Sequence, residues 1–93
     1  MASSVSDLEP LAHEVEVTDD ELIVSLSDGR RVCTPIVWFP RLLNASRTQR
    51  SNWRLIGGGI GIHWPEVDED ISVAGILRGL PSAEYRHLEA SRG

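Results

Sequence analysis

The sequence predicts an α+β domain, in which an antiparallel sheet made of an N-terminal β-meander and a second hairpin carries short helices on one face. Residues 13–17 and 22–26 alternate polar and apolar side chains, with the two-residue period of half-buried strands. Apolar stretches on both sides of the triple glycine 57–59 indicate the second hairpin. The length of 93 residues allows one small domain with a thin core.

The first part of the chain predicts three antiparallel strands. A turn cluster at 18–20 separates the first two strands. Ser27-Asp28-Gly29 predicts a tight turn, because an Asp-Gly pair tolerates the positive φ that such turns need. Residues 30–34 then return as the third strand.

Short helices are expected in the middle of the chain. Pro40 fits the first turn of a helix, where its missing N–H has no partner to lose. Leu42 and Leu43 give this helix an apolar side. Thr48 is expected to cap a second short helical turn that runs to Trp53.

The last third of the chain predicts the hairpin and two further helices. Residues 55–56 pair with 60–64 around the glycines, and an acidic loop follows at 68–70. The last residue of this loop, or Ser72, is expected to cap a short helix that ends at about Leu77. The expected organisation is a frayed lead-in over 1–10, a single domain over 11–80, and a C-terminal tail with a weak helix over 81–93.

The composition excludes several chemistries. All nine basic residues are arginine, which rules out lysine-dependent phosphate loops, Schiff bases and Ser–Lys dyads. The single cysteine, Cys33, rules out an intrachain disulfide and a cysteine-rich zinc site. The three histidines lie far apart in the sequence. We therefore expect no enzyme activity, no catalytic residues, no cofactor and no metal.

Two further expectations concern location. No apolar run reaches the roughly 18–20 residues of a membrane helix. The N-terminal residues lack the basic and apolar regions of a signal peptide. We therefore expect a cytoplasmic protein that does not bind membranes.

Charge is unevenly distributed along the chain, whose formal net charge is −5. Residues 1–28 contain eight acids and no arginine, residues 29–65 contain six arginines and no acid, and residues 66–93 contain six acids and three arginines. If the mid-chain arginines share a face, they form a positive patch within a negative envelope. The alternative is that folding pairs these arginines with acids.

An aromatic and basic group is the most suggestive feature of the sequence. Arginine and tryptophan are enriched at the centres of protein interfaces, and arginine beside aromatic rings also suits single-stranded nucleic acid. The competing interpretation is that the tryptophans fill the core while arginine stems cover it. The candidate partner-binding residues are Trp38, Arg41, Arg47, Arg50, Trp53 and Arg54.

The acidic run that contains Asp68, Glu69 and Asp70 is a second candidate for contact with a partner. Carboxylates ahead of a helix more often act as caps or solvated charge, and the spacing does not match an EF-hand calcium loop. His63 could act as a general base, although no serine or cysteine nucleophile can be tied to it. The glycine run 57–61 is better explained by a tight turn than by phosphate binding.

These segments resemble a known family of small bacterial proteins, DUF2442. The resemblance is carried by LSDGRRV, VWFPRLLNAS and QRSNWRLIGGGIGIHWPEVDEDISVAGILRG, and it covers roughly residues 12–81. It implies a small α+β fold, no established enzymatic activity or cofactor, and frequent pairing with another small protein in toxin–antitoxin-like arrangements. The ending HLEASRG departs from the usual family ending.

The sequence thus predicts a non-catalytic protein-interaction or regulatory module, antitoxin-like, whose partner is another small toxin-like or regulatory protein. The alternative is a nucleic-acid-linked transcriptional regulator that uses an arginine-rich surface, although the acidic chain is not expected to bind nucleic acid alone. A thin core and an unpaired sheet edge also suggest a homodimer.

Overall fold

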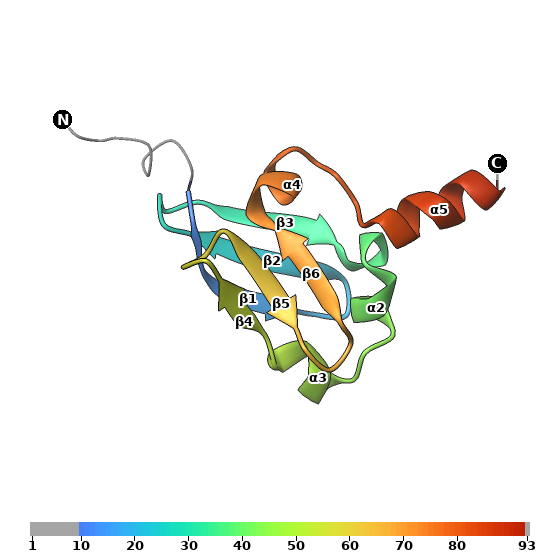
Figure 1. Cartoon of the computed structure of the whole chain (residues 1–93), viewed down its shortest axis with the longest axis horizontal. Coiled ribbons are helices and arrows are strands. Elements are labelled where there is room, and N and C mark those ends of the chain that lie inside the picture. Colours follow the sequence, from blue (N-terminus) through green and yellow to red (C-terminus); the bar gives the residue numbers. More distant parts are fainter. Residues whose placement is uncertain (1–9, 93) are drawn as a thin grey trace.

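The strands form two three-stranded antiparallel sheets in the structure, a computed structural model that describes residues 10–92 (Figure 1). One sheet has the order β1-β2-β3 and the other β4-β5-β6. In chain order, the elements are β1 (Ala12–Val17), β2 (Glu21–Leu26), β3 (Arg31–Pro35), the 3₁₀ helix η1 (Ile36–Trp38), α2 (Pro40–Leu43), α3 (Arg47–Ser51), β4 (Arg54–Ile56), β5 (Gly61–Trp64), β6 (Glu69–Ser72), α4 (Val73–Leu77) and α5 (Ala83–Arg92).

The predicted α+β class, with its meander and second hairpin, is confirmed. The meander forms as expected, and Gly29 adopts a φ of 94° in the turn between β2 and β3. The predicted lead-in lies almost wholly outside the described residues. None of the helices within residues 10–92 has both the length and the apolar character needed to span a bilayer.

The two sheets enclose a common hydrophobic core. In Figure 1 the sheet β4-β5-β6 lies across the sheet β1-β2-β3. Alternate residues of β2 and β6 point inward, with the two-residue period of a strand, whereas a bulge between Ala12 and Glu14 interrupts this alternation in β1. The buried cluster joins both sheets to the middle helices and consists of Ala12, Val15, Leu22, Val24, Leu26, Ile36, Phe39, Leu42, Ile62, Trp64, Ile71, Val73 and Ile76.

Two local predictions are wrong. The cap of α3 is Ser46 rather than Thr48: the Ser46 hydroxyl accepts from the Gln49 N–H, and the Gln49 side chain accepts from the Ser46 N–H. This reciprocal capping box places Thr48 inside the first turn. The acidic segment is also not a loop beyond Asp68, because Glu69–Ser72 is strand β6. Its inward positions alternate with outward ones, which is the strand period.

Helices α4 and α5 each start at a serine side-chain cap. The Ser72 hydroxyl accepts from the Gly75 N–H and begins α4, as predicted. The Ser82 hydroxyl accepts from the Tyr85 N–H at the start of α5. This last helix projects away from the sheets (Figure 1). Its first turn is linked to the body by a hydrogen bond from the Ser82 N–H to the Trp38 carbonyl.

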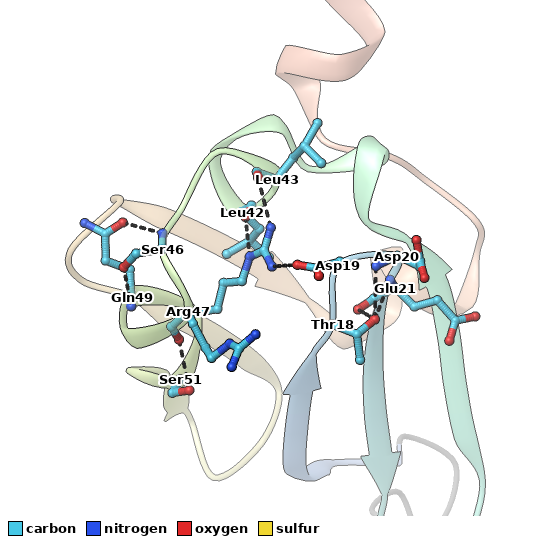
Figure 2. A network of polar contacts seen from close by, with 11 residues as sticks. Thr18, Asp19, Asp20, Glu21, Leu42, Leu43, Ser46, Arg47, Gln49 and Ser51 are labelled. Carbon is cyan, nitrogen blue, oxygen red and sulfur yellow. Dashed lines mark hydrogen bonds and ion pairs between the residues drawn. The ribbon is translucent and has the colours of Figure 1, made fainter.

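Arg50 joins three segments that are far apart in the sequence. Its guanidinium donates to the carbonyls of Leu42 and Leu43 at 2.9 and 3.0 Å and to the Asp19 carboxylate at 2.8 Å. Figure 2 shows these acceptors converging from the end of α2 and from the turn between β1 and β2. Only 11% of the Arg50 side chain is exposed. The last carbonyls of a helix lack partners within it, so this guanidinium satisfies acceptors that α2 leaves open.

The tight turn between β4 and β5 connects the two sheets. The Ala12 N–H donates to the Gly59 carbonyl at 2.8 Å. Gly59 has a φ of 120°, and a Cβ at this position would overlap the backbone oxygen of Ala12. Gly58 also has a positive φ, but open space surrounds it. The glycine at 59 is therefore required by both conformation and close approach.

We expect Arg50→Lys to lower the free energy of unfolding by about 1–3 kcal/mol, because an ammonium group cannot reproduce the planar donor arrangement at three acceptors. Urea denaturation followed by tryptophan fluorescence measures this effect. The matched control is Arg47→Lys on the same helix, which is exposed and should change stability by less than about 0.5 kcal/mol. Equal effects of the two substitutions would show that the Arg50 contacts contribute little.

We expect Gly59→Ala to destabilise the fold by about 2–4 kcal/mol, since the added methyl group must displace the start of β1. Gly58→Ala carries only the conformational cost, about 1 kcal/mol. Thermal unfolding of the two variants separates steric overlap from backbone strain. Similar losses at both positions would contradict the close approach inferred for Gly59.

Candidate functional site

The mid-chain arginines do not gather into one patch of unpaired charge. Three of the six form ion pairs with described acids: Arg30 with Asp28, Arg41 with Glu84, and Arg50 with Asp19. Arg47 and Arg54 are exposed and form no ion pair with the side chains that the structure describes. Folding therefore pairs part of the basic segment with acids from both ends of the chain, which was the alternative to a positive patch.

The two tryptophans of the candidate set lie against the core. Trp38 in η1 and Trp53 after α3 are partly buried and pack on the buried cluster. The third tryptophan, Trp64, is fully buried in β5, and its indole N–H donates to the Arg50 carbonyl at 3.0 Å. The aromatic members of the predicted group thus contribute to core packing, and their partly open edges are what remains for contact with a partner.

Arg41 is the member of the basic group that meets the acidic segment. It lies in α2, and its guanidinium donates to the Asp68 carbonyl, lies 3.8 Å from the Asp68 carboxylate and pairs with Glu84 of α5 at 3.0 Å. The hydrogen bond with Glu84 raises the pKa of Arg41 above its ordinary value. Asp68 itself turns the chain at a φ of 53°. One cation is therefore shared among several carboxylates.

Glu69 is the unusual carboxyl group of this region. It starts β6 opposite Trp64 on the inward face of the sheet, and only 7% of the residue is exposed. None of the hydrogen bonds and ion pairs that the side chains of residues 10–88 form involves its carboxylate. Burial raises the pKa of Glu69 to about 7, Arg41 opposes this increase, and Glu84, Asp70 and Asp68 add to it.

Asp70 points to the opposite face of β6 and contacts His63. The His63 Nδ1 and the Asp70 carboxylate lie 2.5 Å apart, in a cross-strand pair. Arg54 is the cross-strand partner of His63 on β4, so the three residues form one row across the outer face of the sheet. The next outward side chain on β6 is Ser72, whose hydroxyl caps α4. The row therefore pairs a histidine with a carboxylate, and the neighbouring Ser72 hydroxyl serves as the helix cap.

We define the acidic surface as Arg41, Asp68, Glu69, Asp70 and Glu84. Three open hollows of about 210, 350 and 370 Å³ adjoin it around the base of α5. The first contains Glu69 and Asp70 and shares Ala83 with the second. The second and third share Pro40 and Glu84. The acidic surface is thus continuous with an uneven, hollowed area.

Sequence reasoning found part of this arrangement. Arg41, Asp68, Glu69 and Asp70 were expected to be contact residues, and the structure brings them together. Glu84 was not singled out, since nothing in the sequence indicates that the tail helix returns to α2. Among residues 10–92, no three histidine, cysteine, aspartate or glutamate side chains are grouped so that they could hold a metal ion.

The raised pKa of Glu69, about 7, links stability to pH. Because the folded protein holds this proton more tightly than the unfolded chain, the contribution of Glu69 to stability is most favourable below about pH 4.5 and falls as the pH rises to about 7. We expect Glu69→Gln to remove this fall and to raise stability at pH 8 by roughly 1–3 kcal/mol. Urea denaturation at pH 5 and pH 8 measures both effects. Asp68→Asn, the exposed neighbour, should keep the pH dependence, and a flat wild-type profile would contradict the burial argument.

Solved structures with the same fold come from two bacteria. A crystal structure of a protein of unknown function from Rhodospirillum rubrum is similar to this chain with a TM-score of 0.69 and 28% identity, over 81% of this chain and 93% of that one. A solution NMR structure of an uncharacterised protein from Chromobacterium violaceum has a TM-score of 0.73 and 17% identity, over 90% of this chain and 80% of that one, and at this identity it shows the fold alone.

No curated protein matches the chain significantly. The family model described as "Protein of unknown function (DUF2442)" matches residues 12–82, which confirms the resemblance noted from the sequence. Because this match spans most of the described domain, from the first strand to the start of the last helix, the chain belongs to the DUF2442 family.

Proposed function

We propose that this chain is a non-catalytic protein-interaction module, antitoxin-like or regulatory, which binds another small protein through the acidic surface. The observation that carries the proposal is the joint presence of hollows, carboxylates and exposed apolar side chains around the base of α5. Interfaces between proteins combine apolar centres with charged rims. Hollows lined by both kinds of side chain provide places for a partner's side chains.

Exposed leucines border the acidic surface. Leu80 lines the same hollow as Glu69, and Leu88 lines the same hollow as Glu84. Both leucines are exposed, as are Leu43 at the end of α2 and Leu77 at the end of α4. Burying such side chains against a partner contributes roughly 25 cal/mol per Å² of apolar surface. The acidic surface therefore combines exposed apolar side chains with carboxylates in the same hollows.

The polar groups near His63 support a non-catalytic function. The Nδ1 of this histidine faces Asp70, and Ser72 is committed to the cap of α4. A histidine that activates a serine nucleophile lies within hydrogen-bond reach of its hydroxyl, whereas the Ser72 oxygen on the neighbouring strand accepts from the Gly75 N–H. Arg54 adds a positive charge to the row rather than a nucleophile.

The nucleic-acid alternative loses half of its proposed contacts. Of its four arginines, Arg41 and Arg50 are engaged with Glu84 and Asp19, and the exposed Arg47 and Arg54 remain. Two phosphate contacts would give a log–log salt slope of only about −2. The acidic surface would meanwhile repel the phosphate backbone.

We expect the tagged full chain to recover one small protein in a defined stoichiometric complex from its source cells. The double variant Asp68→Asn with Glu84→Gln should weaken this complex by about tenfold at low salt, because paired surface charges guide association. The matched control is Glu14→Gln with Glu16→Gln on exposed positions of β1, which should leave the affinity unchanged. Light scattering after gel filtration gives the mass, and thermal unfolding confirms that each variant is folded.

Two results would contradict the proposal. One is a chain that stays monomeric and recovers no partner under any condition. The other is equal loss of binding in both double variants, which would show that the acidic surface has no special part in the contact. A doubled mass of the isolated chain would identify the homodimer that the thin core suggests.

A further inference from the structure

The hollow beside Glu69 has the features of a site for one side chain. Its volume of about 210 Å³ equals roughly seven water molecules at about 30 Å³ each. Phe39, Ile71 and Ile76 form an apolar wall, and Glu69 lies at the polar end. A long side chain with an apolar stem and a charged head matches this division.

The carboxylate of Glu69 is the acidic group of this hollow that has no partner among the described side chains. Only 7% of the residue is exposed, and its carboxylate oxygens open onto the hollow instead of receiving a hydrogen bond or an ion pair from those side chains. Among the other polar residues of the hollow, Ser72 and Ser82 cap α4 and α5, and Asp70 contacts His63. A buried carboxylate without a partner is costly, and an incoming cation with several N–H donors relieves that cost.

The charges around the hollow favour a cation. Asp68, Asp70 and Glu84 surround Glu69, and the guanidinium of Arg41 is already shared between Asp68 and Glu84. Arg86 of α5 lines the same hollow but does not pair with Glu69. The four carboxylates therefore exceed the two arginines, and the whole chain is acidic as well.

We propose that the hollow between β6, α4 and the start of α5 receives an arginine side chain of the partner protein, whose guanidinium pairs with the Glu69 carboxylate. This inference rests on the proposed function, and it adds that the partner presents a basic residue at this place. A guanidinium suits the site because its planar donors match the two oxygens of a carboxylate. The apolar wall then covers the methylene stem.

The probe for this site is N-acetyl-arginine N-methylamide, added to the isotope-labelled full chain and followed by amide chemical shifts. We expect shifts at residues 69–72, 75–76 and 80–86. The citrulline analogue has nearly the same shape but no charge, and it should bind at least about tenfold more weakly. Equal binding of the two compounds would overturn the proposal.

Three variants of the chain complete the test. Glu69→Gln should weaken binding of the arginine probe at least about tenfold, whereas Asp68→Asn should change it less than about twofold. Arg86→Gln should strengthen it, because a like charge leaves the edge of the hollow. Unchanged affinity in Glu69→Gln, or equal losses in Glu69→Gln and Asp68→Asn, would show general attraction to an acidic surface and would contradict the site.

The same variants separate this inference from the proposed function. A partner complex that Glu69→Gln leaves unchanged would overturn the inference and leave the proposed function standing. Probe binding that depends on Glu69 in a chain with no partner protein would contradict the proposed function while supporting a cation site. Loss of both partner and probe in Glu69→Gln alone supports both.

Discussion

The packing of Trp64 and the contacts of Arg50 together hold the middle of the chain against the two sheets. The indole is the largest fully buried side chain, and its N–H reaches the backbone carbonyl of Arg50. The guanidinium of the same arginine completes the open carbonyls of α2 and contacts Asp19 in the first turn of the meander. Short helices of four and five residues have little stability of their own, so these tertiary contacts fix their positions. Arg41 of the acidic surface lies on α2, whose position these contacts fix, and Glu69 is paired with Trp64 across β5 and β6.

Strand β6 contributes carboxylates to the acidic surface from both of its faces. The strand period turns Glu69 inward and Asp70 outward, so neighbouring carboxylates occupy different environments. The inward group is buried and lacks a partner, whereas the outward group lies beside a histidine on the next strand. Arg41 and Glu84 then connect α2 to α5 at the edge of the same region. Two neighbouring carboxylates thus line the same hollow although one belongs to a buried residue and the other to an exposed one.

Much of the fold could be predicted from local patterns, because the alternation of polar and apolar residues in strands and the residues that favour turns depend on only a few neighbouring positions. The meander, the glycine turn and the Ser72 cap are of this kind. The α3 cap was missed because Ser46 and Thr48 are both good caps, and only the reciprocal contact with Gln49 distinguishes them. Strand β6 was missed because its run of charges hides a single inward apolar residue, Ile71. The pairing of Arg41 with Glu84 spans 43 positions and depends on where α5 lies, which no local pattern encodes.

The packing of the second sheet on the first has a consequence for how the chain folds during synthesis. The inward face of the first sheet is covered by Ile62, Trp64 and Ile71, which are made long after β3 is complete. Until these residues pack on it, the apolar face of the three-stranded meander is exposed to water. The hydrophobic core is therefore completed only when the second hairpin has been synthesised and packs on the meander, and before that point the exposed apolar face favours aggregation.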